Sequence, residues 1–534
     1  MQYLQMAMSK KPFFSMFICL LFPLLVPAQA GFLDPSFSND GSAITSFLSG
    51  GHASASDVAL LPNGRILVVG GTWQPSDDIS SQIALLRYMP DGTIDETFGI
   101  NGKKMVGLPN LNAEANKIWL LPDGKFLCAG SAWNNEDDYF LLARFNADGS
   151  PDPAFDGDGI LLKQVSNYAQ YGTSLVVQPD GKILLGGIAN ITGYLEPVVW
   201  RFHANGTVDN SFGGGAGFVH TPLGDSYAGV EEIMLQSDGR IVVACHATIG
   251  NLEKFAALRY LPNGNPDNSF SSDGKVIFSI TSGEDFPSSA VLQPDGKIVI
   301  AGYCQVQPAN TGMAVVRILP NGNLDSGFGD NGVKIIQVSN AHEQLSDIAL
   351  QPDGKLLLGG SANVNGTYHT AMARLLPNGQ SDASFGQSGS IVHNLNTLGD
   401  NIQALRLQAD GKIVSAGSFW IDGRHNFAVC RFSNVVPTVD NDEPAAQEAT
   451  VRLYPNPVRE QAILEIDSEA SGACTVDLYD LQGKRVKNLS PDVFLPAGQQ
   501  KIELLFPTDL PAGRYLLLVE TAEWRKSLPL VLMR

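Results

Sequence analysis

Aromatic side chains with acids and amides beside them recur in the variable segments of this chain, between short apolar runs. An aromatic ring can stack on a sugar ring, while carboxylates and amides hydrogen-bond its hydroxyls. We therefore expect a ligand face for a glycan or a peptide, although ordinary enrichment of such residues in exposed loops explains the pattern equally well. The candidates are Trp73, Asp77, Asp78, Trp133, Asn134, Glu136, Asp137, Asp138, Tyr194, Tyr303, Tyr368, Trp420, Asp422 and His425.

No recognised catalytic or metal-binding motif accompanies these residues. The sequence contains no GxSxG, no HExxH, no phosphate loop and no dinucleotide fingerprint. His246, His369 and His393 have no partners at ligand spacing. Fragments such as DGDG lack the alternate acids and final Glu of a calcium loop, so Asp156 and Asp158 are expected in turns. The sequence therefore names no catalytic residue, no metal and no cofactor.

The elements that carry these loops are copies of one unit. The stretch VLQPDGKIVIAG has six close relatives, and the turn residues that mark the copies are spaced by 60, 57, 58, 57, 58 and 57 residues. Pro and Asp suit the centre of a type I turn, and the next Gly suits the left-handed position, so each copy predicts a β-hairpin. The markers are Asn63, Asp123, Asp180, Asp238, Asp295, Asp353 and Asp410.

Each unit holds four apolar runs bounded by Gly, Pro, Asn and Asp, which predicts four strands. In the unit 267–319 they are KVIFSI, the two arms of AVLQPDGKIVIAG, and MAVVRIL, and TSGEDFPSS is expected to be a loop. Seven four-stranded units favour a seven-bladed β-propeller over a linear β-solenoid, whose coils are shorter. The predicted class is all-β.

An arginine recurs in the last strand of each unit, and in six units an Asp follows it eight residues later, as in Arg87 and Asp95. A buried, unpaired guanidinium is costly, and a catalytic residue is needed once, so we predict structural ion pairs. Arg431 and Asp34 lack such partners and should pair in a closed ring, with the strand around 42–47 as the outermost strand of the seventh blade. The other pairs include Arg144 with Asp152 and Arg201 with Asp209.

The repeat itself resembles a known family. The patterns LDxxFGxxG, QPDGKIVVAG and FALARYxPDGxLD, over residues 33–433, resemble the delta-60 repeats of bacterial exported proteins. The departures are Cys245 and His246 where glycines usually stand, and Ile318 in place of the aromatic that follows the arginine. The resemblance implies an exported repeat protein, and it implies no particular enzymatic reaction.

Composition narrows the class of partner. A chain of 534 residues with 44% hydrophobic side chains can bury large cores. Its formal charge of -19 argues against nucleic acid as a partner, because phosphate neutralisation needs basic stripes. The later cysteines are scattered at apolar strand positions and are predicted to be buried core residues; they are Cys128, Cys245, Cys304, Cys430 and Cys474.

The N-terminus is predicted to be a signal peptide, residues 1–30. Lys10 and Lys11 precede the apolar run PFFSMFICLLFPLLV, and AQA forms a small-residue cleavage pattern before Gly31. No later run is long enough for a transmembrane segment. We expect the propeller to occupy 31–434, followed by an acidic, Pro-containing linker at 435–450.

Residues 451–534 hold further short apolar runs and predict a small antiparallel β-sandwich. This tail resembles the C-terminal sorting domain of the type IX secretion system of Bacteroidetes. The resemblance implies the secretion machinery as partner, passage across the outer membrane, and removal of the tail before release or surface attachment. The matching residues include Tyr454, Pro455, Asn456, Pro457, Gly483, Gly513 and Tyr515.

Two functions fit these observations. The first is a secreted or outer-membrane-surface binding module that contacts its ligand through one loop face of a rigid ring. The alternative is a secreted polysaccharide-acting hydrolase or lyase with carboxylates at the channel mouth, since glycosidases need two carboxyl groups close together. Paired acids at the mouth would favour the enzyme, and an aromatic platform would favour the binder.

Overall fold

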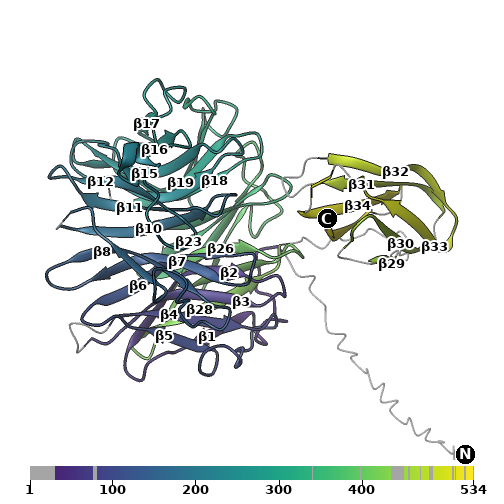
Figure 1. Ribbon diagram of the computed structural model, residues 1–534, viewed down its shortest axis with the longest axis horizontal. Helices are drawn as coiled ribbons and strands as arrows, with labels where there is room; N and C mark the ends of the chain where they lie inside the picture. Colours follow the sequence, from purple (N-terminus) through teal and green to yellow (C-terminus); the bar gives the residue numbers. More distant parts are fainter. Residues whose placement is uncertain are drawn as a thin grey trace, which may run out of the picture.

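The structure is a computed structural model of the full chain (Figure 1). It describes residues 30–75 and 81–434, apart from 167, 309, 340 and 397, and residues 450–532, apart from 455–457, 469–470, 480–484, 508–509, 512 and 522–524. Asp77 and Asp78, almost all of the predicted signal peptide and almost all of the linker lie outside the described residues.

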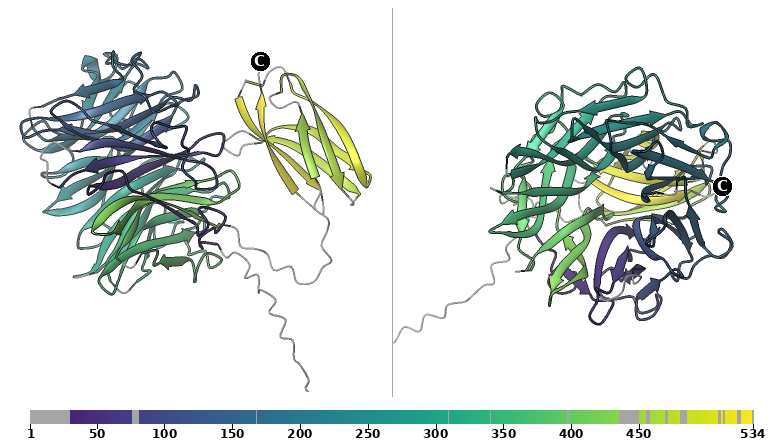
Figure 2. Two further views of the ribbon diagram at one scale, coloured as in Figure 1. Left: turned by 90° about the horizontal axis from the view of Figure 1, so that it is seen from below. Right: turned by 90° about the vertical axis from the view of Figure 1, so that its left-hand side faces the viewer.

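Seven four-stranded antiparallel sheets, here called blades, follow one another around a ring (Figures 1 and 2). Their strands are β2 (His52–Leu60), β3 (Ile66–Trp73), β4 (Gln82–Tyr88) and β5 (Lys103–Val106) in blade 1; β6 (Asn112–Leu120), β7 (Phe126–Trp133), β8 (Asp138–Phe145) and β9 (Ile160–Lys163) in blade 2; β10 (Gln170–Val177), β11 (Ile183–Asn190), β12 (Leu195–Phe202) and β13 (Phe218–His220) in blade 3; and β14 (Ala228–Leu235), β15 (Ile241–Ile249), β16 (Leu252–Tyr260) and β17 (Lys275–Phe278) in blade 4.

The remaining blades have the same layout. Their strands are β18 (Asp285–Leu292), β19 (Ile298–Gln307), β20 (Asn310–Ile318) and β21 (Val333–Ile336) in blade 5; β22 (Glu343–Leu350), β23 (Leu356–Val364), β24 (Thr367–Leu375) and β25 (Ser390–His393) in blade 6; and β26 (Asp400–Leu407), β27 (Ile413–Ile421), β28 (Arg424–Phe432) and β1 (Ser42–Thr45) in blade 7. The first strands of neighbouring blades contact one another around the ring, β26 meeting β2, so they surround the central channel. The predicted seven-bladed propeller is confirmed.

Strand exchange between distant parts of the chain closes the ring. β1 pairs antiparallel with β28, with Ser42 opposite Cys430 and Thr45 opposite Phe427, so the N-terminal strand is the outer strand of blade 7, as predicted. Residues before β1 also take part. The Gly386 N–H donates to the carbonyl of Ala30 at 3.0 Å, as the Gly329 N–H donates to Asn378 in the neighbouring blade at 2.9 Å.

The repeated arginine ties each blade to the next. Arg201 Nε lies 2.8 Å from Asp209 Oδ2 within blade 3, and its Nη1 donates to the Pro262 carbonyl of blade 4 at 2.5 Å. The guanidinium also lies over the Phe212 ring, 4.5 Å from its centroid. The same Nε–Oδ2 contact, at 2.7 Å, joins Arg87 to Asp95, Arg144 to Asp152 and Arg431 to Asp34.

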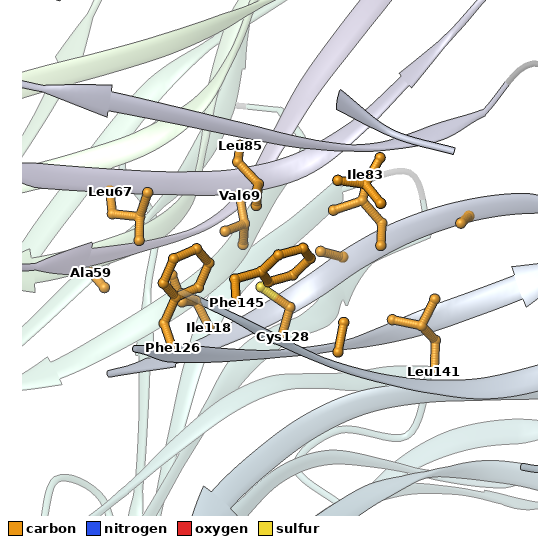
Figure 3. Close-up of a cluster of buried hydrophobic side chains, with 14 of the residues drawn as sticks. Ala59, Leu67, Val69, Ile83, Leu85, Ile118, Phe126, Cys128, Leu141 and Phe145 are labelled. Carbon is orange, nitrogen blue, oxygen red and sulfur yellow. The ribbon is translucent and has the colours of Figure 1, made fainter. Parts of the chain in front are cut away.

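Apolar side chains fill the spaces between adjacent blades, because each sheet buries both faces. Figure 3 shows one such cluster, in which Leu67, Val69 and Leu85 of blade 1 pack against Phe126 and Phe145 of blade 2. The five described cysteines are all buried and unpaired, as predicted for core residues.

The structure differs from the sequence prediction at the start of the inner strands. The loop expected at 281–289 ends early, because β18 already begins at Asp285 and pairs with β19 through a bulge between Pro287 and Ser289. Polar residues and the bulge hide the strand's alternation in the sequence. Between β12 and β13, the residues Gly213–Gly215 form a 3₁₀ turn.

The tail forms two packed antiparallel sheets, ordered β29-β30-β33 and β32-β31-β34-β35. Tyr515 is buried between them and donates its hydroxyl to the Pro511 carbonyl at 2.9 Å. Tyr454 is exposed, and Pro455, Asn456, Pro457 and Gly483 lie outside the described residues. The strands are β29 (Thr450–Tyr454), β30 (Gln461–Ser468), β31 (Gly472–Tyr479), β32 (Arg485–Leu495), β33 (Gly498–Leu505), β34 (Gly513–Thr521) and β35 (Arg525–Leu532).

Candidate functional site: the mouth of the propeller channel

A β-bulge in every inner strand aims one polar side chain into the central channel. In each of the seven pairings between the first and second strands, the register skips one residue, as between Ala55 and Asp57. A bulge leaves its extra residue outside the ladder and redirects its side chain. The seven skipped residues all line one cavity of about 330 Å³; they are Ser56, Asn116, Thr173, Glu231, Ser288, Ser346 and Gln403.

Ion pairs join the inner strands beside this cavity. Lys117 Nζ lies 2.5 Å from Glu232 Oε2, across from blade 2 to blade 4. Arg406 of blade 7 pairs with Asp57 of blade 1 and with Asp347 of blade 6, the latter at 3.0 Å. The charged groups that link blades in this network are therefore bound to one another.

Glu231 is the one acid among the seven bulge residues. Its Oε1 lies 2.5 Å from Nδ1 of His246 on the adjacent strand β15. The Tyr227 ring stacks on the imidazole at 4.6 Å between centroids, and the Tyr227 hydroxyl lies 3.0 Å from that of Tyr171. Burial and the neighbouring Tyr227 raise the pKa of Tyr171, so its phenol stays protonated at neutral pH. These contacts hold the carboxylate in one orientation.

Three tryptophans form an arc across three consecutive blades. Trp73, Trp133 and Trp420 each lie ten residues after the marker of their hairpin, on the second strands of blades 1, 2 and 7, which are consecutive in the ring. The equivalent residues of the other four blades are polar: Asn190, Thr248, Gln305 and Asn363. The rings of the three tryptophans are partly exposed.

Histidines link two members of this arc at the seam between blades 7 and 1. The His52 ring stacks on Trp73 at 5.1 Å, with the planes 7° apart, and it lies 5.8 Å from the Trp420 ring. His425 packs edge-on against Trp420 at 4.6 Å. Burial, and then the neighbouring His52, lower the pKa of His425, which keeps it neutral at pH 7. The cluster is an aromatic surface at this seam.

Trp133 overhangs a second cavity, of about 450 Å³, that adjoins the central one. The two cavities have Asn116 and Thr173 in common as lining residues. Glu114 and Asp138 also line the second cavity. Burial raises the pKa of both carboxyl groups, which makes them weaker acids than an exposed carboxyl.

The other predicted ligand residues divide into two groups. Tyr368 lines a third cavity, of about 380 Å³, together with Trp420 and His425. Tyr303 stacks on Phe286 at 4.9 Å, near Glu231.

The remaining candidates lie in the loops themselves. The side chain of Asn134 accepts hydrogen bonds from the Glu136 and Asp137 amides, at 2.8 Å each, and so shapes its own loop. Tyr194 and Asp422 lie in exposed turns and line none of the three cavities described above.

Several carboxylates near the mouth accept hydrogen bonds from backbone amides of the neighbouring loops, and these bonds fix the loops in place. Asp285 accepts the Ile280 amide at 2.9 Å and pairs with Lys254 at 2.9 Å. Glu343 accepts the amides of Val338 and Ser339, and Asp400 accepts those of Thr370 and Asn396. Burial of these carboxylates is compensated by hydrogen bonds, which is a structural role.

Sequence reasoning did not predict the seven bulge residues that line the central cavity, nor the Glu231–His246 pair. Each bulge residue lies seven residues before its hairpin marker, and His246 lies eight residues after its own. An alignment of the seven copies would show a polar residue at the first position in every copy, with a carboxylate only in the fourth. A single copy carries no such signal.

Within the described part of the chain, no three His, Cys, Asp or Glu side chains come together as metal ligands. None of the described helices is long and apolar enough to cross a bilayer.

The fold defines a seven-bladed β-propeller followed by a β-sandwich tail. The chain belongs to the family described as "domain of unknown function (DUF5122) beta-propeller", which matches residues 61–98, 121–155, 178–212, 236–270, 293–328, 351–385 and 408–434. Residues 452–531 match the secretion system C-terminal sorting domain. This domain indicates recognition by the type IX machinery and export to the cell surface or beyond it.

Comparison with curated proteins and solved structures adds no argument about fold or activity. A search of curated proteins found no match. The polysaccharide lyase Uly1 aligns over 67% of this chain and 87% of its own, with 13% identity and a TM-score of 0.38. The soluble aldose sugar dehydrogenase of Escherichia coli aligns over 61% of this chain and 100% of its own, with 14% identity and a TM-score of 0.32. Likenesses of this size carry no argument about activity.

Proposed function

We propose that the propeller is a cell-surface or secreted module that binds a glycan chain at its channel mouth. The observation that carries this proposal is the arc of Trp73, Trp133 and Trp420 on three consecutive blades. Trp133 lines a cavity next to the central one, into which six of the seven bulge residues bring hydroxyl or amide side chains. Aromatic faces stack on the apolar faces of sugars, and neutral polar groups pair with sugar hydroxyls. The C-terminal sorting domain directs such a module to the cell surface or beyond it.

The test is a screen of the full mature chain against soluble polysaccharides, with affinities of the hits measured by calorimetry. Trp133→Ala and Trp420→Ala should each weaken binding by about tenfold, because losing a stacked ring costs on the order of 1.4 kcal/mol. Tyr194→Ala is the matched control, since Tyr194 is an exposed aromatic that lines none of the cavities described here. Tryptophan variants that bind as tightly as the parent would reject the proposal.

A polysaccharide-acting hydrolase is the second candidate, and Glu114 favours it. Burial raises the pKa of this carboxyl, which lies in the cavity under Trp133, and a general acid needs a raised pKa. Turnover would appear as new reducing ends in the same screen, and Glu114→Gln should abolish it. Binding without product would leave the binding module as the function.

A further inference from the structure

The central channel carries more negative than positive charge. Its inner-strand network contains the two cations Lys117 and Arg406, against three paired carboxylates, and Glu231 adds a fourth. Both cations are bound by these carboxylates, so neither is available to a ligand. The channel therefore disfavours an anionic ligand and favours a cationic one.

The carboxylates of the network are already occupied by the protein. Asp347 accepts the Ile348 and Leu405 amides, both at 2.8 Å, in addition to its pair with Arg406. Asp57 accepts the Ile118 amide at 3.0 Å and also pairs with Arg406. Glu232 accepts Ser174 and Lys117, one on each oxygen. These acids hold the inner strands together and have little capacity left for a ligand.

Glu231 differs from Asp57, Asp347 and Glu232 because one of its two carboxylate oxygens accepts no hydrogen bond from a described residue. His246 holds Oε1, whereas no hydrogen bond from a described residue reaches Oε2, and the side chain is 24% exposed in the wall of the cavity. Among the described residues, Nε2 of His246 is buried and has no hydrogen-bond partner, so a proton there would be costly. Nδ1 is therefore the nitrogen that donates to Oε1 of Glu231, which leaves Oε2 facing the cavity.

We propose that Glu231 binds a protonated amine, so that the glycan held at the channel mouth is one that carries free amino sugars. The six other bulge residues are neutral hydrogen-bonding groups suited to sugar hydroxyls, and Trp133 covers the adjoining cavity. Among the described residues, no three His, Cys, Asp or Glu side chains come together here as metal ligands. This inference rests on the proposed glycan-binding function and names its ligand class.

The experiment compares three oligosaccharides of equal length on the full mature chain by calorimetry: glucosamine, N-acetylglucosamine and glucose oligomers. The parent should bind the glucosamine oligomer about tenfold or more tightly than the other two, as expected for a charge-assisted hydrogen bond. Glu231→Gln should remove this preference, because the amide keeps an acceptor for His246 but carries no charge. Glu136→Gln, at an exposed acid of the β7–β8 loop, is the control and should retain it.

The possible outcomes distinguish failure of the role proposed for Glu231 from failure of the proposed glycan binding. Equal affinity for the three oligomers in the parent, with dependence on Trp133, would overturn the role of Glu231 and leave glycan binding intact. A preference for the N-acetylated oligomer would do the same. No binding of any oligomer, with tight binding of a lysine-containing peptide, would overturn both. The comparison of ligands on the parent protein needs no variant, so it holds even if Glu231→Gln fails to fold.

Discussion

Arg201 shows how one residue can join two blades. It pairs with Asp209, donates to the Pro262 carbonyl of the next blade and lies over the Phe212 ring. Arg201→Ala removes all three contacts and leaves the buried Asp209 without its closest cation. We expect the free energy of unfolding to fall by about 3–5 kcal/mol, as for breaking a buried ion pair.

Urea unfolding followed by tryptophan fluorescence measures this loss. The control is Arg424→Ala, an exposed arginine at the start of β28, which should change stability by no more than about 0.5 kcal/mol. An Arg201→Ala protein that unfolds at the same urea concentration as the parent would show that the contacts to Asp209 and Pro262 add nothing to stability.

Sequence reasoning identified the partners of the repeated arginines but did not identify Glu231 or its partner His246. The spacing of eight residues between Arg and Asp recurs along the chain and so indicates its own partner, including the distant pair of Arg431 with Asp34. Glu231 faces the cavity because a bulge redirects the inner strand, and its partner His246 comes from the neighbouring strand. Neither the bulge nor the strand register is visible in a single copy.

At the scale of elements, the hairpins were predictable because turn chemistry fixes them. The inner strands were predicted too short, since their first residues are polar and the bulge breaks the alternation, as at Asp285 to Ser289. The candidate site therefore lies where the alternation of polar and apolar residues in the inner strands is weakest.

The closing pair β1–β28 offers a direct test of the seam. Ser42 lies opposite Cys430, and the neighbouring pair is hydrogen-bonded, with the Arg431 N–H donating to Gly41 at 2.9 Å. Ser42 and Cys430 are therefore a non-hydrogen-bonded pair, whose short Cα separation suits a disulfide. Ser42→Cys should form one with the native Cys430 under oxidation and stabilise the propeller by about 2–4 kcal/mol.

Thiol titration and mass spectrometry of the unfolded protein detect the bond, and thermal melting with and without reductant measures its effect. Ala43→Cys is the matched control, because its partner Val429 has no thiol. A Ser42→Cys protein that keeps both thiols free after oxidation, or that melts at the same temperature with and without reductant, would contradict the strand exchange at this seam.

At the scale of the whole molecule, the ring repeats one charged contact in every blade. The aspartate of each contact has a lowered pKa: burial opposes ionisation, and hydrogen bonds together with the arginine charge outweigh it. The affected residues are Asp34, Asp95, Asp152, Asp209, Asp267, Asp325 and Asp382. For Asp209 the pKa falls from 3.8 to about 2, through Ser211 and Arg201.

A carboxyl whose pKa is lower in the folded state binds protons more readily in the unfolded state. Its contribution to stability is complete above the unfolded value, near 3.9, and is lost as the pH falls through the folded value. Because seven blades share this contact, we expect the melting temperature to be nearly constant from pH 7 to pH 5. It should then fall steeply between about pH 4 and pH 2, with all blades unfolding together.

Circular dichroism melts across this range provide the measurement, and Asp209→Asn, which cannot titrate, should melt lower than the parent at pH 7 and differ less from it at pH 2. A steep loss of stability between pH 7 and pH 5, or none down to pH 2, would assign the acid response to groups other than these aspartates.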